Sequence, residues 1–273
     1  YRTDRVESPP ATWHELIDMA ERLGERGTIQ VQGERYEGFT VFFTSLLASA
    51  GGAILSADGQ SVSLENQPTR QALAVMRRLA NSSAADPSLA TAREDQARIA
   101  FETGESSFMI NYTFVWPSAQ ANAPGIAEHM GWARWPAVIE GHPSRVTIGG
   151  INLGIGAYSH HPDLAFEAAT CIASEPNQRL AATRGGLPPT IAVLYDDEDV
   201  RATFPFADLL RETLRGGQVY YLHNEVKTIE ETARKLRELL ADGERRLRWM
   251  GELQHSREEE LEWKSEQLET KDR

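Results

Sequence analysis

The sequence predicts an α/β fold, because helix-like and strand-like apolar patterns alternate along residues 12–189. Hydrophobic residues make up 41% of the 273 residues and charged residues 25%, which is the balance of a folded globular protein. The chain has 28 basic and 40 acidic residues, and its formal charge is −12. Because an acidic chain repels phosphate backbones, no nucleic-acid partner is expected.

Helices are predicted where apolar residues recur at helical spacing and a cap signal stands at one end. Thr12 and Glu15 have the spacing of a capping box before the first helix, and Gly24 ends that helix. Asn66 is placed to cap a second helix. Further helices are expected over 36–50, 93–102, 162–174 and 175–184.

Strands are predicted from β-branched and aromatic content and from turn signals. Residues 29–32 alternate, and residues 107–111 have the composition of a buried strand. Residues 53–65 have the pattern of a hairpin around Asp58-Gly59. The Gly-rich run 146–158 predicts a central strand pair with close backbone approach.

Few residues suggest catalysis or metal binding. Cys171 is the only cysteine and lies in a mostly apolar run, so we expect a buried, unreactive thiol. His160 and His161 match no metal-ligand spacing, and the chain has no Gly-x-Ser-x-Gly nucleophile elbow. We therefore expect no catalytic residue, no metal and no cofactor. A carbohydrate-acting hydrolase with two close carboxylates stays an alternative.

Five segments in a fixed order carry a family resemblance. They are 1–16 with Tyr-Arg-Thr-Asp and Pro-Pro-Ala-Thr-Trp-His-Glu-Leu, 36–52 with Tyr-Glu-Gly-Phe-Thr and Ala-Gly-Gly, 101–111, 149–153, and 174–189 with Gly-Gly-Leu-Pro-Pro. Over residues 1–215 this order resembles the family 1 extracellular solute-binding proteins of ABC sugar importers. Within that family it most resembles the actinobacterial trehalose-binding lipoproteins, although Glu105 stands where the family pattern has lysine.

The resemblance implies a two-lobed fold of the type II periplasmic-binding-protein kind, whose first segment we expect upstream of Tyr1. Residues 1–148 would then form mainly the second lobe, and residues 149–215 a crossing strand and part of the first lobe. The resemblance further implies an extracytoplasmic, non-enzymatic protein, lipid-anchored through a segment not in this sequence. Its lobes would close by a hinge on a trehalose-like or maltose-like disaccharide and deliver it to an ABC permease and ATPase.

The composition changes after Arg215, and residues 216–273 are predicted to form a charged helical tail of uncertain origin. The segment from about 215 to 240, with Arg-Gly-Gly-Gln-Val-Tyr-Tyr-Leu, resembles a helicase segment of transcription-repair coupling factors. No phosphate-binding loop accompanies it, so no ATPase activity is expected. An engineered, truncated or composite chain with a non-functional binding-protein scaffold therefore stays an alternative.

Candidate ligand residues follow from the chemistry of sugars, which offer hydroxyls for hydrogen bonds and C–H faces for stacking. Tyr112, Phe114 and Trp116 follow the buried strand and form either a ring platform or ordinary core. Glu37 would accept hydroxyl hydrogen bonds, or it serves the first turn of a helix.

The later part of the chain adds further candidate ligand residues, namely Asn152, Arg184, Gly185, Gly186 and Leu187. The two glycines let a ligand approach the backbone closely, although a helix C-cap explains them as well. Arg184 would add a donor fork, and Asn152 is either an amide ligand or a hinge residue.

Overall fold

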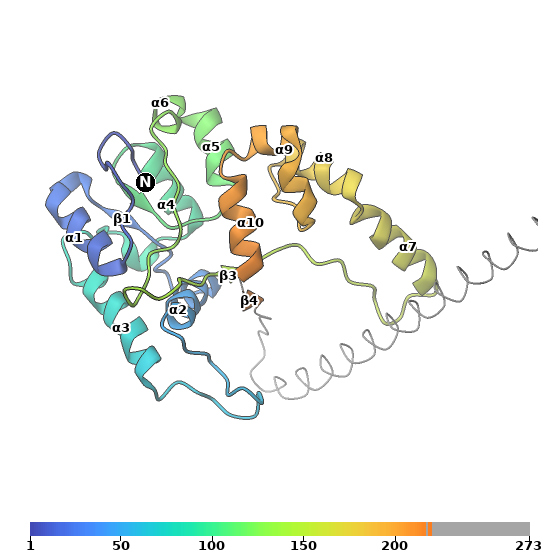
Figure 1. Ribbon diagram of the computed structural model, residues 1–273, viewed down its shortest axis with the longest axis horizontal. Coiled ribbons are helices and arrows are strands. Elements are labelled where there is room, and N and C mark those ends of the chain that lie inside the picture. The colour runs from blue at the N-terminus through green and yellow to red at the C-terminus, as the bar shows by residue number, and fades with distance from the viewer. Residues whose placement is uncertain (217, 220–273) are drawn as a thin grey trace, which may run out of the picture. The chain divides into compact units, whose positions relative to one another are not determined.

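The computed structural model describes residues 1–216, 218 and 219, and Tyr1–Tyr220 form one compact unit (Figure 1). Most of the predicted charged helical tail lies outside the described residues. Among the described residues, no helix is both long enough and apolar enough to cross a lipid bilayer.

The first half of the unit alternates helices with short strands, as predicted. The elements are α1 (Trp13–Leu23), β1 (Ile29–Gln30), α2 (Glu37–Ser49), α3 (Gln67–Ala80), α4 (Glu94–Glu102), β2 (Phe108–Met109), α5 (Val115–Asn122) and α6 (Pro124–Ala127), with short 3-10 turns at Gly24–Arg26 and Leu89–Thr91.

The predicted helix starts are confirmed by their cap geometry. The Thr12 hydroxyl accepts the Glu15 backbone N–H at 3.1 Å, and the Asn66 side chain accepts that of Thr69 at 2.9 Å. The Glu15 carboxylate returns to the Ala11 backbone N–H at 2.7 Å, one residue before the position that a standard capping box would use. The starts of α1 and α3 are therefore marked by hydrogen bonds within a few residues of the chain.

β1 and β2 form a parallel pair, with Ile29 opposite Phe108 and Gln30 opposite Met109. The alternating pattern of residues 29–32 predicts one solvated face, yet Ile29 and Gln30 are both buried. Gln30 is satisfied by donating to the Asp86 carboxylate at 2.7 Å. A parallel strand covered by helices on both sides buries both faces, which explains the difference.

The main core surrounds Trp13, which is fully buried. Its ring meets the edges of Phe42 and Trp135 at centroid distances of 5.5 and 5.2 Å. Edge-to-face contacts of this kind stabilise aromatic clusters beyond the area that they bury. This cluster packs α1 against α2 and the segment before residue 139.

The second half of the unit builds a smaller core. Its elements are β3 (Thr147–Ile148), α7 (Pro162–Ile172), α8 (Glu175–Gly185), the 3-10 helix Ala192–Asp196, α9 (Glu198–Thr203), α10 (Ala207–Gly216) and β4 (Gln218–Val219), which pairs in parallel with β3. Figure 1 shows α8, α9 and α10 gathered together. The residues buried there are Ala182, Tyr195, Val200, Phe204, Phe206 and Ala207.

Two predictions in the second half are wrong. The expected strand pair over 146–158 is present only at Thr147–Ile148, and residues 149–158 are exposed without strand structure. Cys171 was expected to be buried but is exposed on α7. Residues 149–158 have no partner strand among the described residues, and α7 contacts α8 without burying Cys171.

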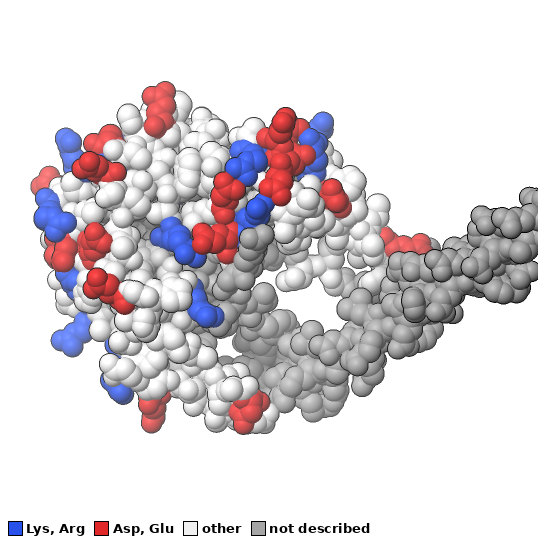
Figure 2. All heavy atoms as spheres, viewed as in Figure 1, with Lys and Arg blue, Asp and Glu red and all other residues white. Residues whose placement is uncertain are grey.

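The charged side chains of the described residues are mixed in sign. Figure 2 shows basic and acidic groups interspersed on one face, with neither sign forming a continuous patch. Several of them pair, as in the bidentate contact of Arg201 with Asp208 at 2.9 Å for both hydrogen bonds. A phosphate backbone would find no extended basic stripe on this face.

Candidate functional site

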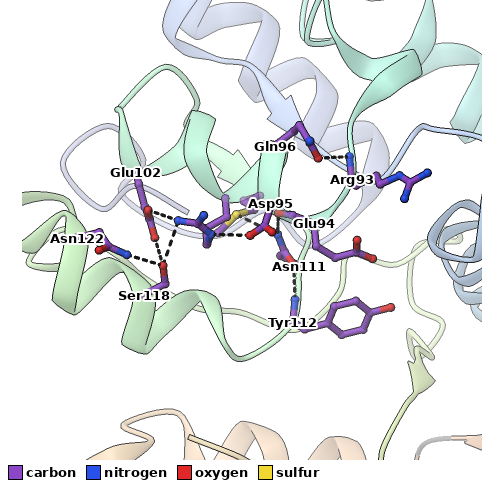
Figure 3. Close-up of polar contacts among 11 residues, drawn as sticks. Arg93, Glu94, Asp95, Gln96, Glu102, Asn111, Tyr112, Ser118 and Asn122 are labelled. Carbon is purple, nitrogen blue, oxygen red and sulfur yellow. Dashed lines mark hydrogen bonds and ion pairs between the residues drawn. The ribbon is translucent and has the colours of Figure 1, made fainter.

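The end of β2 presents Tyr112 at the surface. The Asn111 side chain donates to the Glu94 backbone carbonyl at 2.9 Å and accepts the Tyr112 backbone N–H at 2.9 Å (Figure 3). Asn111 thereby ties the strand end to the first turn of α4. The Tyr112 ring is 40% exposed and extends to the same side as the Glu94 carboxylate (Figure 3).

Two carboxylates lie close to the Tyr112 ring. Partial burial, followed by the negative charges of Glu37 and Glu94, raises the pKa of Tyr112 to about 12. Glu37 begins α2, and Glu94 begins α4. The charge of Glu37 therefore acts on Tyr112, although 74 residues lie between them in the sequence.

Tyr36 extends this group of rings and acids. Burial raises the pKa of its hydroxyl, and the neighbouring Glu94 carboxylate acts in the same direction. The Arg93 guanidinium lies 4.7 Å from the Tyr36 ring centroid and also binds both Glu34 carboxylate oxygens, at 2.6 and 2.5 Å. Since Arg93 is committed to Glu34 and Tyr36, the Glu37 and Glu94 charges dominate around Tyr112.

A polar network fixes the helix that follows Tyr112. Arg98 on α4 donates to Glu102 at 2.6 Å and to the Ser118 hydroxyl at 3.2 Å, and Ser118 donates to Glu102 at 2.6 Å (Figure 3). Asn122 donates to the same Ser118 oxygen at 3.1 Å. The Glu102 side chain is only 9% exposed, so these bonds act in a poorly solvated place and hold α5 against α4.

The three candidate rings do not share one environment. Phe114 precedes α5 and is 37% exposed, as Tyr112 is at 40%. Trp116 instead packs edge-on against Trp132 at 5.7 Å and Phe206 at 6.5 Å. Tyr112 and Phe114 are therefore partly exposed, whereas Trp116 packs against the smaller core, as the alternative interpretation of these rings expected.

The glycine pair after α8 forms a helix cap. Gly186 has φ +64°, a left-handed conformation, and its backbone N–H donates to the Ala182 carbonyl at 3.1 Å. A Cβ placed on Gly186 would lie 3.4 Å from Pro117 of α5, so this loop touches the helix that follows the ring platform. The candidate residues Arg184, Gly185 and Leu187 are exposed beside it.

Asn152 lies apart from this arrangement. It belongs to the exposed stretch 149–158, and no hydrogen bond of its side chain is found among the described residues. The structure thus brings Gly186 to α5, while Asn152 is exposed in the stretch that follows β3.

A cavity of about 240 Å³ lies on the other side of Asn111, and sequence reasoning missed it. Tyr1, Phe108, Met109, Ile110, Asn111, Arg134, Trp135, Val146, Leu209, Leu210 and Thr213 are among its lining residues. The buried indole N–H of Trp135 makes no hydrogen bond among the described residues. The sequence signal that could have revealed this cavity is the aromatic run around residue 135, which belongs to none of the predicted helices or strands.

A second depression, of about 400 Å³, lies between α1 and α3 and is lined by Glu21, Ala74, Arg77, Arg78, Asn81 and Ser82. It has no aromatic ring to stack on a sugar, so it fits a sugar site poorly. Within the described part of the chain, no cluster of three or more His, Cys, Asp or Glu side chains is arranged to hold a metal ion.

The combination of an α/β fold with exposed rings, flanking carboxylates and no metal cluster among the described residues is typical of a protein that binds a small polar solute. The family model described as bacterial extracellular solute-binding protein matches residues 1–179. The chain belongs to this family. The family is one of solute-binding proteins and not of enzymes, which sets aside the hydrolase alternative.

Two relatives illustrate the match. A probable ABC transporter-binding protein of Deinococcus radiodurans is 32% identical over 219 residues, which are 76% of this chain and 52% of that protein. The maltose-bound MalE3 structure of T. maritima has a TM-score of 0.72 and 27% identity, covering 81% of this chain and 59% of its own. The chain spans about half the length of the curated binding protein that it matches.

A short part of the chain is similar to a different protein. The transcription-repair-coupling factor of Haemophilus influenzae is 65% identical over 34 residues, which are 12% of this chain and 3% of that protein.

Proposed function

We propose that this chain binds a disaccharide outside the cytoplasm and delivers it to the permease and ATPase subunits of an ABC importer. The observation that carries the proposal is the exposed Tyr112 ring flanked by the Glu37 and Glu94 carboxylates. The ring offers an apolar face to the C–H face of a sugar, and the carboxylates accept hydrogen bonds from its hydroxyls. Phe114, exposed next along the chain, extends the platform.

The roles of the remaining residues follow from their positions. Gly186 and its neighbours Arg184, Gly185 and Leu187 form the wall beside α5 that a bound sugar would meet. Trp116 packs against Trp132 and Phe206 and so helps to hold α5 in place. Closure would bring a second lobe over the rings by hinge motion.

A maltose-like or trehalose-like ligand is the substrate class that we favour. The T. maritima relative is maltose-bound, and the resemblance of residues 1–215 to trehalose-binding lipoproteins favours trehalose. A lipid anchor in the parent protein belongs to the same proposal.

The experiment is a calorimetric titration of the full chain with maltose and with trehalose, and with sucrose as a control disaccharide. A saturable one-to-one isotherm for maltose or trehalose, with none for sucrose, supports the proposal and identifies the sugar. Equal heats for all three sugars would contradict a dedicated site, since non-specific contacts do not discriminate.

We further propose that the segment from about 215 to 240 is a helicase-derived piece joined to the binding-protein part. The 65% identity to a transcription-repair-coupling factor supports this origin. A chain ending after Val219, which keeps β4 paired with β3, should then keep the sugar affinity and melting temperature of the full chain. A loss of either would mean that the tail belongs to the binding unit.

A further inference from the structure

Two arginine side chains meet at the loop 103–107, which joins α4 to β2. Arg5 donates to the Gly104 backbone carbonyl at 2.9 Å and to that of Ser106 at 3.3 Å. A Cβ placed on Gly104 would lie 3.5 Å from Nη1 of Arg2 and 3.7 Å from Nη2 of Arg5. The two guanidinium groups therefore lie next to the same point beside the loop.

Two buried donors of this place have no acceptor among the described residues. Arg2 is 5% exposed, and Ser106 is fully buried. Nε and Nη2 of Arg2 donate to the Asp4 carboxylate at 2.8 and 2.7 Å, but its Nη1 makes no hydrogen bond within the described chain. The Ser106 hydroxyl makes none there either. Buried polar groups are normally paired, so both donors call for an acceptor from outside the chain.

The charge around the loop is positive, although the whole chain has a formal charge of −12. Burial, followed by the charges of Arg2 and Arg26, lowers the pKa of Arg5, and Asp4 is the acid whose charge acts against this effect. Asp4 is already bound by Arg2. The acceptors of Arg5 are uncharged backbone and hydroxyl oxygens. One carboxylate thus faces three guanidinium groups, and a cation in a poorly solvated place is stabilised by a further anion.

We propose that the loop 103–107, together with Arg2 and Arg5, binds a small monovalent anion such as chloride. An anion accepts hydrogen bonds from Nη1 of Arg2 and from the Ser106 hydroxyl at once, and it balances the positive charge. Ile126 Cδ1 lies 3.6 Å from the Cβ position of Gly104, so an apolar group bounds the site on one side. This anion site is separate from the sugar site in its residues and does not depend on the proposed function.

Thermal melting of the full chain tests the anion site. We compare sodium chloride with sodium gluconate at one sodium concentration of about 0.2 M, so that charge screening is equal. Gluconate is too large to enter between the two guanidinium groups. We expect the chain to melt at least about 3 °C higher in chloride, because a ligand that binds only the folded state stabilises it. Broadening of the chloride magnetic resonance line should show saturable binding to the same protein.

Three variants make the test specific. Arg5→Gln should abolish the difference in melting temperature and the line broadening. Arg70→Gln makes the same change of charge at an exposed position of α3 and should leave both intact. Ser106→Ala removes a hydroxyl that has no partner in the described chain, so it should keep the fold and weaken chloride binding at least about threefold.

Equal melting in chloride and gluconate, without line broadening, would overturn the proposal, because the two donors would then bind water. Line broadening that persists in both Arg5→Gln and Ser106→Ala would overturn it as well, since chloride would then bind elsewhere on the chain. If Arg5→Gln does not fold, the comparison of Ser106→Ala with Arg70→Gln decides between these outcomes.

Discussion

At the scale of single residues, the chemistry of the site depends on the Tyr112 ring. Tyr112→Ala should weaken sugar binding about tenfold, since it removes the stacking face between the two carboxylates. The ring is 40% exposed, so the free energy of unfolding should change by less than about 1 kcal/mol. Titration and thermal melting of the variant measure both. Tyr158→Ala, at a tyrosine that is 96% exposed, is the matched control and should change neither.

Arg98 has two acidic partners, Glu102 and Asp95, and replacing each in turn tests the polar network that holds α5 against α4. Glu102→Ala should lower the free energy of unfolding by about 2 kcal/mol, because it leaves Arg98 and Ser118 without their poorly solvated acceptor. Asp95→Ala removes a partner of Arg98 whose side chain is 70% exposed, and it should cost less than about 0.5 kcal/mol. Denaturant unfolding measures both values. Equal losses would mean that the network does not fix α5.

At the scale of elements, variants at the end of α8 distinguish two interpretations of its glycines, namely a helix cap and a place of close ligand approach. Gly186→Ala should lower stability by about 1 kcal/mol, because alanine is strained at φ +64°. Gly185→Ala sits within the helix and meets only Leu187, at 3.8 Å, so stability should stay the same or rise by up to about 0.5 kcal/mol. If Gly185→Ala nevertheless weakens sugar binding in a titration, a glycine is required at this position because the ligand approaches the backbone closely.

The start of α9 gives a pH dependence of known sign. Asp197 caps α9 and accepts a hydrogen bond from Arg179 at 2.7 Å, which holds the pKa of Asp197 below its ordinary value of 3.8. A depressed pKa contributes stability above the ordinary value, and that contribution is lost as the pH falls through the pKa of the folded state. Asp197→Asn keeps a cap but loses the charge. Above about pH 5, the variant should therefore melt at a lower temperature than the natural chain. Below about pH 3, the two melting temperatures should converge. A constant difference across this range would refute the assignment.

Local signals predicted the elements better than the contacts between them. The caps at Thr12, Asn66 and Gly186 act within a few residues, so the sequence was sufficient to predict those helix ends. The meeting of Glu37 with Tyr112 depends on how α2 and α4 pack, and only the family order placed both in one site. Residues 149–158 were predicted as strands for a sound reason, but a strand also needs a partner.

At the scale of the whole molecule, two cores of different character divide the described chain. The larger core, around Trp13, supports the strand end that presents Tyr112. The smaller core, around Tyr195 and Phe204, holds Trp116 and the loop at Gly186. The candidate site lies where elements of both cores approach α5.

The most direct test of the central claim, that Tyr112 and Glu37 form a sugar site, is a nuclear magnetic resonance titration of the folded full chain with maltose and trehalose. The account predicts saturable shifts at Glu37, Tyr112 and Phe114, with a dissociation constant of about 1 mM or tighter. Resonances of the α1–α3 depression should not move. Saturable shifts confined to that depression, or no shifts at about 50 mM sugar, would contradict it.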